Sequence, residues 1–598
     1  MLAEPTLDDD QSKAVESDAV SLVVVAGAGC GKTEVVSRRV QRLLLTSTAD
    51  PYRVLAISYT VRASDELRDR LYGRVGDQRS RIVADTIHGF AWTLLRQYGS
   101  RIGLPLEPEV LAREADRTDL LQRWLLTSGQ PPVDDPIGAL QRIDLARARD
   151  EDAPLLGEWK QALATSGTVD YPAMIDLARE LVTDQWVGRH LHTLLGHVVV
   201  DEAQNLTASQ YDLITKLIGD PGDGHIPATL VGDGRQSIVT FAGADPTLMQ
   251  RFEADYRAER IELRINYRSA RVLAQAADVV SQHLGHPTKA MGGTNFAARG
   301  VIYIKELPDE VAEATYVAQW VSWILEHGLP GGAASPTDPT QVQPEEIAIL
   351  ARAASSLLPC RLALAQRSID SAASSSEESW VASTVAKALV ELVAFRSAKD
   401  RYFTRRHLED LCGATTATED VAALLSSAAD GDVRHLTALL DCPDVSSMMQ
   451  SAAALPISDP DWRADWEQLF GAWLTFTERT DAAGLSFGGF QQHIARCQRG
   501  EPTTPGVRLR TVHKAQGQEF KAVAIVACND GQFPDFRAKG KEASTAELRT
   551  FYVGVTRPSR ALLLTRSMER LTRHGGPMVT ARSPFLELLD SLAASPTS

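Results

Sequence analysis

The sequence has few cysteines and no long apolar run. Its 598 residues include six cysteines, none close to another and none in a CxxC pair, which argues against a local zinc or iron–sulfur motif. No apolar stretch is long enough to cross a bilayer. The start, Met1–Pro5, lacks the charged and apolar regions of a signal peptide. We therefore expect a cytoplasmic chain with reduced thiols and no membrane contact.

The chain also lacks an excess of positive charge. Its formal net charge is −15, with 44% hydrophobic and 23% charged residues, which is ordinary for a globular protein. The charge is uneven, because Glu501–Ser598 contains 14 Lys and Arg against 9 Asp and Glu. Phosphate contacts need a local basic groove rather than a basic whole. The length exceeds what one core supports, so we expect several domains.

The sequence does contain a glycine-rich turn, Ala26-Gly27-Ala28-Gly29-Cys30-Gly31-Lys32-Thr33. It follows the apolar run Leu22–Val25 and precedes a predicted helix, Glu34–Leu45. In a phosphate-binding loop of this kind, backbone N–H groups and the helix N-terminus surround phosphate oxygens. Lys32 would reach the β- and γ-phosphates, and Thr33 would hold Mg²⁺. A turn that only packs a helix on a strand is the alternative interpretation.

Two further apolar runs end in polar residues. His197–Val200 leads to Asp201 and Glu202. Asp201 can hold Mg²⁺ through water, and Glu202 can orient and deprotonate an attacking water. Thr229–Val231 leads to Gln236, which would sense the γ-phosphate. An exposed acidic turn and an ordinary loop glutamine are the alternatives.

Short apolar runs alternate with helical stretches along much of the chain, which predicts an α/β fold with two parallel sheets. The first sheet would contain Leu22–Ala26, Val54–Tyr59, Ile82–Ala84, His197–Val200 and Thr229–Val231. The second would contain Val301–Ile304, Ile347–Leu350, Arg508–Val512, Val523–Val526 and Leu562–Thr565. Two long segments, about 101–189 and 370–504, are helical in character, and the second begins at an exposed linker, Ser371–Glu378. The predicted core of the first helical segment contains Trp124, Leu125, Trp159 and Trp186.

Further motifs follow one another in a fixed order. They are Gln11 within Leu7–Gln11, Ser58–Thr60 with Ala63, Thr86–Phe90, Asp201–Gln204, Gly232–Gly243, Asn266–Ser269, Thr511–Phe520, Glu547–Arg549 with Tyr552–Arg557, and Ser583–Leu586. Together with the glycine-rich turn, this order resembles the UvrD/Rep family of superfamily 1A DNA helicases. The resemblance extends from about Leu7 to Leu589 but hardly touches the two helical segments.

The resemblance implies two RecA-like P-loop NTPase domains with mainly helical insertions. Domain 1A would comprise residues 1–100 and 190–262, insertion 1B 101–189, domain 2A 263–370 and 505–598, and insertion 2B 371–504. ATP and Mg²⁺ would bind between 1A and 2A. Gln11 would read the adenine, Tyr267 would stack on it, and Glu519 would touch the ribose side. Arg268 and Arg557 would reach the γ-phosphate as arginine fingers; surface solubility is their alternative role.

The resemblance also implies that single-stranded DNA crosses domains 1A and 2A. Tyr59, His88 and Phe241 are the candidates for stacking on bases, with ordinary core packing as the alternative. The implied activity is ATP-dependent translocation on single strands and 3′–5′ unwinding of a 3′-tailed duplex. One alternative is a motor or DNA-activated ATPase subunit of a separate nuclease, in DNA repair or phage defence. Another is a DNA-responsive ATP switch that recruits other proteins.

The sequence departs from the family pattern at three places. Glu34 follows the P-loop threonine where the family usually has arginine, which predicts weaker adenine packing or looser nucleotide choice. Motif III of the family, Gly232–Gly243 here, contains Val239-Thr240-Phe241-Ala242, so one aromatic ring remains while a second ring and two cations are missing. Gln516 stands where the family often has lysine. The change in motif III affects the residues that, in the family, would couple ATP hydrolysis to stepping along DNA.

Overall fold

The computed structural model describes most of the chain, and the statements below concern those residues. They are 6–47, 49, 51–105, 108–222, 224–284, 293–294, 298–330, 333–334, 341–373, 381–397, 402–413, 420–480, 485–497, 505–571 and 576–594. The chain divides into two compact units. The first contains Met1–Leu106, Thr118–Ser374 and Thr504–Ser598, and the second contains Glu107–Arg117 and Ser375–Thr503. Within the described ranges, no helix has both the length and the apolar character needed to span a bilayer.

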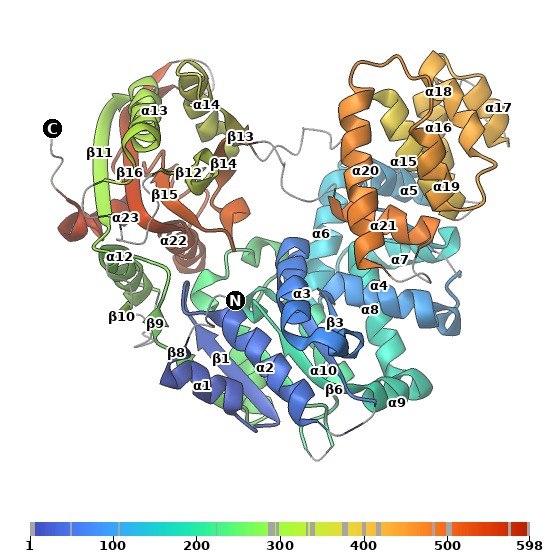
Figure 1. Ribbon diagram of the computed structural model, residues 1–598, viewed down its shortest axis with the longest axis horizontal. Coiled ribbons are helices and arrows are strands. Elements are labelled where there is room, and N and C mark those ends of the chain that lie inside the picture. The colour runs from blue at the N-terminus through green and yellow to red at the C-terminus, as the bar shows by residue number, and fades with distance from the viewer. Residues whose placement is uncertain are drawn as a thin grey trace. The chain divides into compact units, whose positions relative to one another are not determined.

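The first unit contains a six-stranded parallel sheet that carries the glycine-rich turn (Figure 1). Its order is β3 (Ile82–Thr86), β2 (Arg53–Ser58), β6 (Leu195–Val200), β7 (Ala228–Gly232), β1 (Ser21–Ala26) and β8 (Glu259–Leu263). Five of these strands match the predicted apolar runs, which confirms the parallel sheet. The central strands are nearly continuous apolar segments because both of their faces are buried.

Helices cover both faces of this sheet. The connections β1–α2–β2 and β2–α3–β3 run toward one edge, whereas β6–α10–β7 and β7–α11–β8 run toward the other. Because such crossovers are right-handed, α2 (Lys32–Thr46) and α3 (Val61–Val75) lie on one face. The helices α10 (Ala208–Ile218) and α11 (Leu248–Asp255) lie on the other. In Figure 1, α2 and α3 are in front of the sheet.

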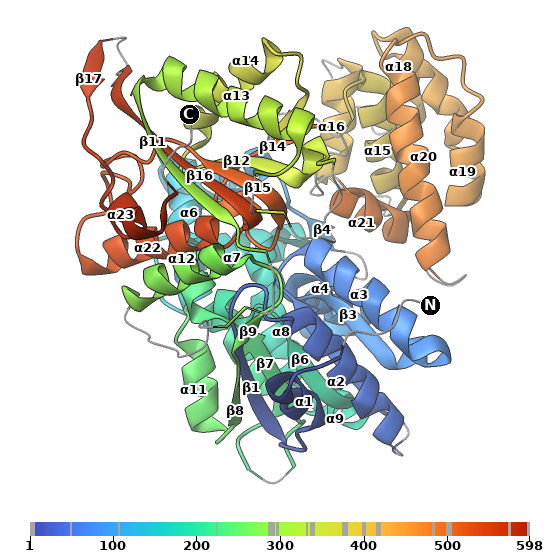
Figure 2. The ribbon, with the colours of Figure 1, turned by 60° about the vertical axis from the view of Figure 1, so that its left-hand side comes forward.

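The first unit contains a second parallel sheet (Figure 2). Its order is β11 (Val301–Asp309), β16 (Pro558–Leu571), β15 (Phe520–Ile525), β12 (Ile347–Ala351), β14 (Val507–Thr511) and β13 (Ser371–Ala373), and β17 (Pro577–Val579) pairs antiparallel with β16. One face carries α13 (Glu310–His327) and α14 (Leu358–Ala365), and the other carries α12 (Arg271–Gln282) and α22 (Lys541–Val555). The predicted linker Ser371–Glu378 is wrong at its start, because Ser371–Ala373 pairs with β14; its remainder lies outside the described residues.

A helical segment separates β3 from β6, as predicted. It contains α4 (Ile87–Tyr98), α5 (Glu114–Thr127), α6 (Pro136–Arg149), α7 (Leu156–Ser166), α8 (Tyr171–Thr183) and α9 (Gln185–Leu194), with the short strands β4 (Glu109–Val110) and β5 (Thr168–Val169). Trp159 is fully buried, and its indole Nε1 donates to Asp170 at 2.9 Å. The prediction that Trp186 is a core residue is wrong. It is 50% exposed and stacks on His190 at the surface of α9.

The second unit is mainly helical around a core of its own. Its helices are α15 (Thr384–Ser397), α16 (Tyr402–Cys412), α17 (Val421–Ser426), α18 (Gly431–His435), α19 (Val445–Ala452), α20 (Trp462–Arg479) and α21 (Phe487–Cys497). The elements not yet named belong to the first unit: α1 (Asp9–Glu16), β9 (Ile265–Asn266), β10 (Gly293–Thr294) and α23 (Pro584–Glu587). The division into domains 1A, 1B, 2A and 2B stays a prediction.

Candidate nucleotide site

The glycine-rich turn joins β1 to α2 through left-handed backbone conformations. Gly29 has a φ of 75° and Gly31 a φ of 81°, which glycine adopts without strain. Space is also restricted, because a Cβ at Gly29 would lie 2.5 Å from Oδ1 of Asn266 and one at Gly31 would lie 2.7 Å from Nε2 of Gln11. The amide of Tyr267 donates to the Gly29 carbonyl at 2.8 Å. The turn is therefore pressed directly against the segment that follows β8.

Gln11 and Tyr267, the two residues predicted to meet adenine, lie in one hydrogen-bond network. Asp8 and Gln11 form a capping box at the start of α1. Nε2 of Gln11 donates to the Cys30 carbonyl at 3.1 Å, and the Tyr267 hydroxyl donates to Oδ2 of Asp8 at 2.6 Å. Burial raises the pKa of the Cys30 thiol to about 11, so Cys30 fills the turn as a neutral side chain.

The two predicted catalytic acids follow β6 directly. Nζ of Lys32 lies 3.2 Å from Oε1 of Glu202, and Gln204 donates to the other oxygen of the same carboxylate. Burial, together with the adjacent Glu202, raises the pKa of Asp201 to about 7. Burial opposes the charge of Glu202 too, but Lys32, Gln204 and Arg557 together outweigh it, so the pKa of Glu202 is lowered. Lys32 thus favours the anionic form that a general base requires.

Glu202 also has an unusual backbone. Its φ of 53° and ψ of 38° place it in the left-handed region, which few residues other than glycine occupy. The carboxylate of the preceding Asp201 accepts from the Glu202 amide at 2.9 Å. Such strained conformations concentrate at functional sites, where the surrounding structure maintains them.

Two oxygen donors fit a hydrated Mg²⁺. Thr33 lies in the first turn of α2, and Asp201 is buried at the carboxyl end of β6. In the described part of the chain, neither the Thr33 hydroxyl nor Oδ2 of Asp201 has a hydrogen-bond partner. Mg²⁺ takes one or two such protein oxygens together with water and nucleotide phosphates.

Asp233 orients Gln236, although the sequence did not single it out. Its Oδ1 accepts from Nε of Arg235 at 2.7 Å and its Oδ2 from Nε2 of Gln236 at 3.0 Å. Oε1 of Gln236 accepts from Nη2 of Arg557 at 3.3 Å. Burial lowers the pKa of Arg557 to about 10, so its guanidinium remains charged at neutral pH. The structure thus brings the predicted γ-phosphate sensor and one predicted arginine finger together.

Two more side chains, to which the sequence assigned no role, reinforce this contact between the sheets. The Tyr552 hydroxyl lies 3.4 Å from Oδ2 of Asp233, and the Arg235 guanidinium lies over the Tyr552 ring. Nε2 of Gln516 donates to the Gln236 carbonyl at 3.0 Å and to Oδ1 of Asn205 at 3.4 Å. The departure from the family lysine at Gln516 is the one signal that could have drawn attention to it.

Arg268, the other predicted arginine finger, is paired with Glu519 in this structure. Oδ1 of Asn266 accepts from the Arg268 amide at 2.8 Å and fixes the turn that carries it. The charge of Arg268 contributes to the lowered pKa of Arg557, which shows that the two guanidinium groups are electrostatic neighbours. Nucleotide phosphate would have to replace the Glu519 carboxylate to engage Arg268.

Of the three rings predicted to contact DNA, two are exposed. Phe241 is 68% exposed and Tyr59 is 37% exposed. The Phe241 ring meets the His513 ring edge-to-face, with the centroids 5.6 Å apart. The half-buried His88 instead directs its ring at Tyr171 of α8, at 5.8 Å. Phe241 and Tyr59 are therefore available for stacking, whereas His88 is engaged by a neighbouring helix.

Glu34 is engaged by arginines of two helices. Its Oε1 lies 2.6 Å from Nε of Arg38 and 2.6 Å from Nη2 of Arg74. These three side chains are 13–17% exposed, so the pairs are largely shielded from water. The residue that replaces the family arginine thus ties α2 to α3.

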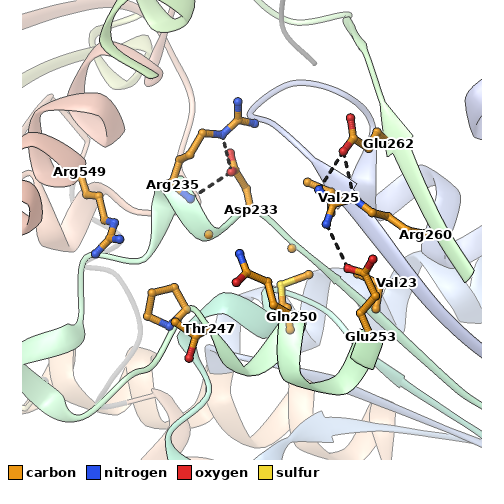
Figure 3. Close-up of a pocket in the computed structure, with 14 residues that line it drawn as sticks. Val23, Val25, Asp233, Arg235, Thr247, Gln250, Glu253, Arg260, Glu262 and Arg549 are labelled. Carbon is orange, nitrogen blue, oxygen red and sulfur yellow. Dashed lines mark hydrogen bonds and ion pairs between the residues drawn. The ribbon is translucent and has the colours of Figure 1, made fainter. Parts of the chain in front are cut away.

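A cavity of about 260 Å³ lies beside this site, between α11 and the strands β1 and β8 (Figure 3). On its far wall Arg260 bonds to both Glu253 and Glu262, at 3.1 and 2.8 Å. Arg549 of α22 lines the opposite side, and burial lowers its pKa. The lining includes Arg235 but no residue of the glycine-rich turn, so this cavity is not the phosphate site.

Comparisons with known proteins agree with this arrangement of motifs. The family model for the UvrD/REP helicase N-terminal domain matches residues 7–135 and 139–257, and that for the UvrD-like helicase C-terminal domain matches residues 494–569. The chain belongs to the UvrD/Rep helicases. Within this family assignment, the first match contains Lys32, Glu202 and Gln236, and the second contains Arg557. Arg268 lies between the matched ranges.

Individual UvrD/Rep helicases are similar over nearly the whole chain. An ATP-dependent DNA helicase UvrD1 of Mycobacterium tuberculosis is 24% identical, covering 99% of this chain and 86% of the relative. DNA helicase II of Escherichia coli is 27% identical, and the match covers 94% of this chain and 85% of the relative. A putative ATP-dependent DNA helicase YjcD of Bacillus subtilis is 24% identical, and the match covers 94% of this chain and 78% of the relative.

Proposed function

We propose that this protein is an ATP-dependent single-stranded DNA translocase and 3′–5′ DNA helicase. The observation that carries the proposal is the contact of Arg557 with Gln236, since it joins the second sheet to the polar end of the strand beside the P-loop. The named activities of the similar helicases support it, and the direction rests on family resemblance. We also propose the boundaries 1–100 and 190–262 for domain 1A, 101–189 for 1B, 263–370 and 505–598 for 2A, and 371–504 for 2B.

In the proposed reaction, ATP binds with its phosphates in the turn Ala26–Thr33. Lys32 would contact the β- and γ-phosphates, and Thr33 and Asp201 would hold Mg²⁺, which would supply positive charge to the transferring group. Glu202 orients a water and accepts its proton. Lys32 keeps Glu202 anionic for this step.

The second sheet supplies the remaining charge. Arg557 and Arg268 would stabilise the negative charge that develops on the γ-phosphoryl oxygens. Gln236 would transmit the presence of that group, because its amide already bonds to Arg557. Closure of the two sheets on ATP and opening after hydrolysis would then move them alternately along a strand.

The adenine would lie near Gln11 and Tyr267, with Glu519 on the ribose side. The DNA strand would cross the carboxyl ends of the parallel strands, where open α/β sheets bind ligands. Phe241 and Tyr59 would stack on bases without reading sequence. We retain His88 as a weaker candidate, since its ring already contacts Tyr171.

The test is steady-state ATP hydrolysis with and without oligo(dT), followed by strand displacement on duplexes with a 3′ or a 5′ tail. We expect Mg²⁺-dependent hydrolysis that single strands stimulate, and displacement of the 3′-tailed duplex only. Lys32→Ala should abolish hydrolysis, and Lys216→Ala, which removes an exposed lysine of α10, is the matched control. Hydrolysis that ignores single strands would overturn the proposal.

A DNA-activated ATPase that does not unwind alone is the second candidate. The observation that favours it is the motif III turn, in which Phe241 is the one aromatic ring and Val239, Thr240 and Ala242 carry no charge. Stimulated hydrolysis without displacement of either duplex would select this candidate. A nuclease or repair partner that restores displacement would then identify the chain as a motor subunit.

A further inference from the structure

Phe536 is the most exposed phenylalanine, tyrosine or tryptophan in the described part of the chain. The ring is 70% exposed, slightly more than that of Phe241. An isolated exposed apolar residue is ordinary at a protein surface. Its significance therefore depends on how the ring is held and on what surrounds it.

The loop that carries Phe536 is fixed at several points. Phe533 is fully buried, and its ring packs against Phe551 and Phe585 at 5.6 and 6.0 Å. The Phe536 amide donates to the Gly531 carbonyl at 3.1 Å. The Asp535 amide donates to Oε2 of Glu547 at 3.0 Å. The structure thus holds the Phe536 ring in solvent on a well-anchored turn.

The turn lies at the carboxyl edge of the second sheet. It follows β15, as Arg352 follows β12 and His513 follows β14. Nε and Nη2 of Arg352 donate to Glu547, at 2.9 and 2.8 Å, and Glu547 in turn anchors Asp535. Burial lowers the pKa of His513 to about 4, and the charge of Arg352 adds to this effect while that of Glu547 opposes it. The His513 ring also contacts the Phe241 ring, so the exposed ring of the first sheet touches a residue at the carboxyl edge of the second sheet.

Three basic residues follow Phe536 within five positions of the sequence. The Arg537 guanidinium lies 5.7 Å from the centroid of the Phe536 ring and also pairs with Asp535 at 2.8 Å. Lys539 and Lys541 are exposed, and their ammonium groups have no ion pair among the residues that the structure describes. An aromatic face beside free cations is the combination that binds single-stranded nucleic acid without sequence preference.

We propose that Phe536 is a base-stacking platform of the second sheet and that Lys539 and Lys541 contact the phosphates of the same single strand of DNA. This proposal rests on the proposed function and extends it to a contact that none of the motifs contains. Stacking on Phe241 and on Phe536 would give each sheet its own contact with the DNA strand. Alternate movement of the sheets requires that each sheet can hold the strand while the other moves.

The first test is fluorescence anisotropy with labelled oligo(dT) on the full chain. Phe536→Ala and Phe536→Leu should each weaken binding about 5- to 100-fold, as the loss of one stacked base does, whereas Phe536→Tyr should bind like the unchanged protein. Trp323→Ala removes another exposed ring, 43% exposed on α13, and should leave binding unchanged. Weaker binding by the alanine variant but not by the leucine variant would overturn stacking in favour of simple apolar contact.

The second test is photocrosslinking, with a benzophenone amino acid in place of Phe536 or of Trp323. We expect a crosslink to oligo(dT) from position 536 and none from 323. The double variant Lys539→Gln, Lys541→Gln should make the negative slope of log K against log salt concentration shallower by about 1.4. Each phosphate that a lysine no longer neutralises reduces the magnitude of the slope by about 0.7. An unchanged slope would overturn the assignment of the two lysines.

The outcomes separate this inference from the proposed function. If the unchanged protein binds no single strand, the proposed function fails. If it binds and its hydrolysis is stimulated, but the Phe536 variants bind equally and position 536 gives no crosslink, the inference alone fails.

Discussion

Nη2 of Arg557 donates to Oε1 of Gln236 at 3.3 Å, so a cation of the second sheet reaches the glutamine of the first that we propose as a γ-phosphate sensor. Nε2 of the same amide donates to Asp233, which fixes the direction of the Gln236 side chain. A phosphate oxygen can only accept, as Oε1 of Gln236 does, so the γ-phosphate would compete with Gln236 for the Arg557 guanidinium and exchange one acceptor of that cation for another. This exchange is the point at which nucleotide would alter the contact between the sheets.

We expect Arg557→Lys to lower kcat for ATP hydrolysis by about 10³-fold, the usual effect of losing an arginine finger. The lysine keeps the charge but cannot reach both Gln236 and the γ-phosphoryl group. Steady-state kinetics with saturating oligo(dT) measure this, and nucleotide binding should change little. Arg361→Lys, at an exposed position of α14, is the control. Turnover within tenfold of the unchanged protein would contradict the assignment.

Gln516→Ala should lower the ratio of DNA-stimulated to DNA-free hydrolysis several-fold. Gln516 bonds to the Gln236 carbonyl and to Asn205, so it connects the second sheet to the motif that we propose senses phosphate. The same rate assay, with oligo(dT) titrated from zero to saturation, gives the ratio. Gln518→Ala is a useful comparison, because the side-chain amide of Gln518 bonds within its own turn to the Lys514 carbonyl. If the ratio of DNA-stimulated to DNA-free hydrolysis did not change, Gln516 would have only a packing role and no part in coupling DNA binding to hydrolysis.

Glu34→Arg should destabilise the protein, although it restores the residue that the family usually has. The new cation would face Arg38 and Arg74, which Glu34 now neutralises. Leaving such shielded charges unpaired costs about 1–3 kcal/mol each. Urea unfolding of Glu34→Gln, Arg74→Gln and the double variant would give the coupling energy. We expect at least about 0.5 kcal/mol, as for residues in direct contact; additive effects would show that the pair is unimportant.

His407 makes the stability of the second unit depend on pH. Its ring bonds to Asp116 at 2.9 Å and to Glu391 at 3.3 Å. Burial disfavours the imidazolium, but these carboxylates outweigh it and raise the pKa from 6.5 to about 9, against a small opposing effect of Arg113. Because the pKa of His407 is raised in the folded state, its ion pairs contribute fully to the stability of the second unit below pH 6.5. This contribution is lost as pH rises through 9.

Hydrogen exchange of the α15 and α16 amides, corrected for intrinsic rates, would measure this effect in the full chain. Protection should fall between pH 6.5 and 9, the two pKa values of His407. In His407→Gln the same amides should be less protected at pH 6.5 than in the unchanged protein, and their protection should change little between pH 6.5 and 9. A parallel fall in both proteins would show that another group titrates.

The parallel sheets could be predicted because their central strands are apolar on both faces. The edge strand β8 could not, since its sequence, Glu259–Leu263, contains three charged residues. The residue types of the phosphate site were visible in the sequence, but their partners were not. Glu34 pairs with Arg74, 40 residues away, and Gln236 is oriented through Asp233 and Arg557. Trp186 shows the same limit, because an indole can be stacked at the surface as well as buried.

The absence of a side chain at Gly29 sets how closely the two sheets can approach. Any Cβ there would collide with Asn266 and Arg268, residues that belong to the chain entering the second sheet. Gly29→Ala would therefore insert a methyl group at this joint and would also strain the left-handed backbone of the turn itself. We expect larger residues at this position to hold the two sheets further apart, so nucleotide turnover should fall as the inserted side chain grows.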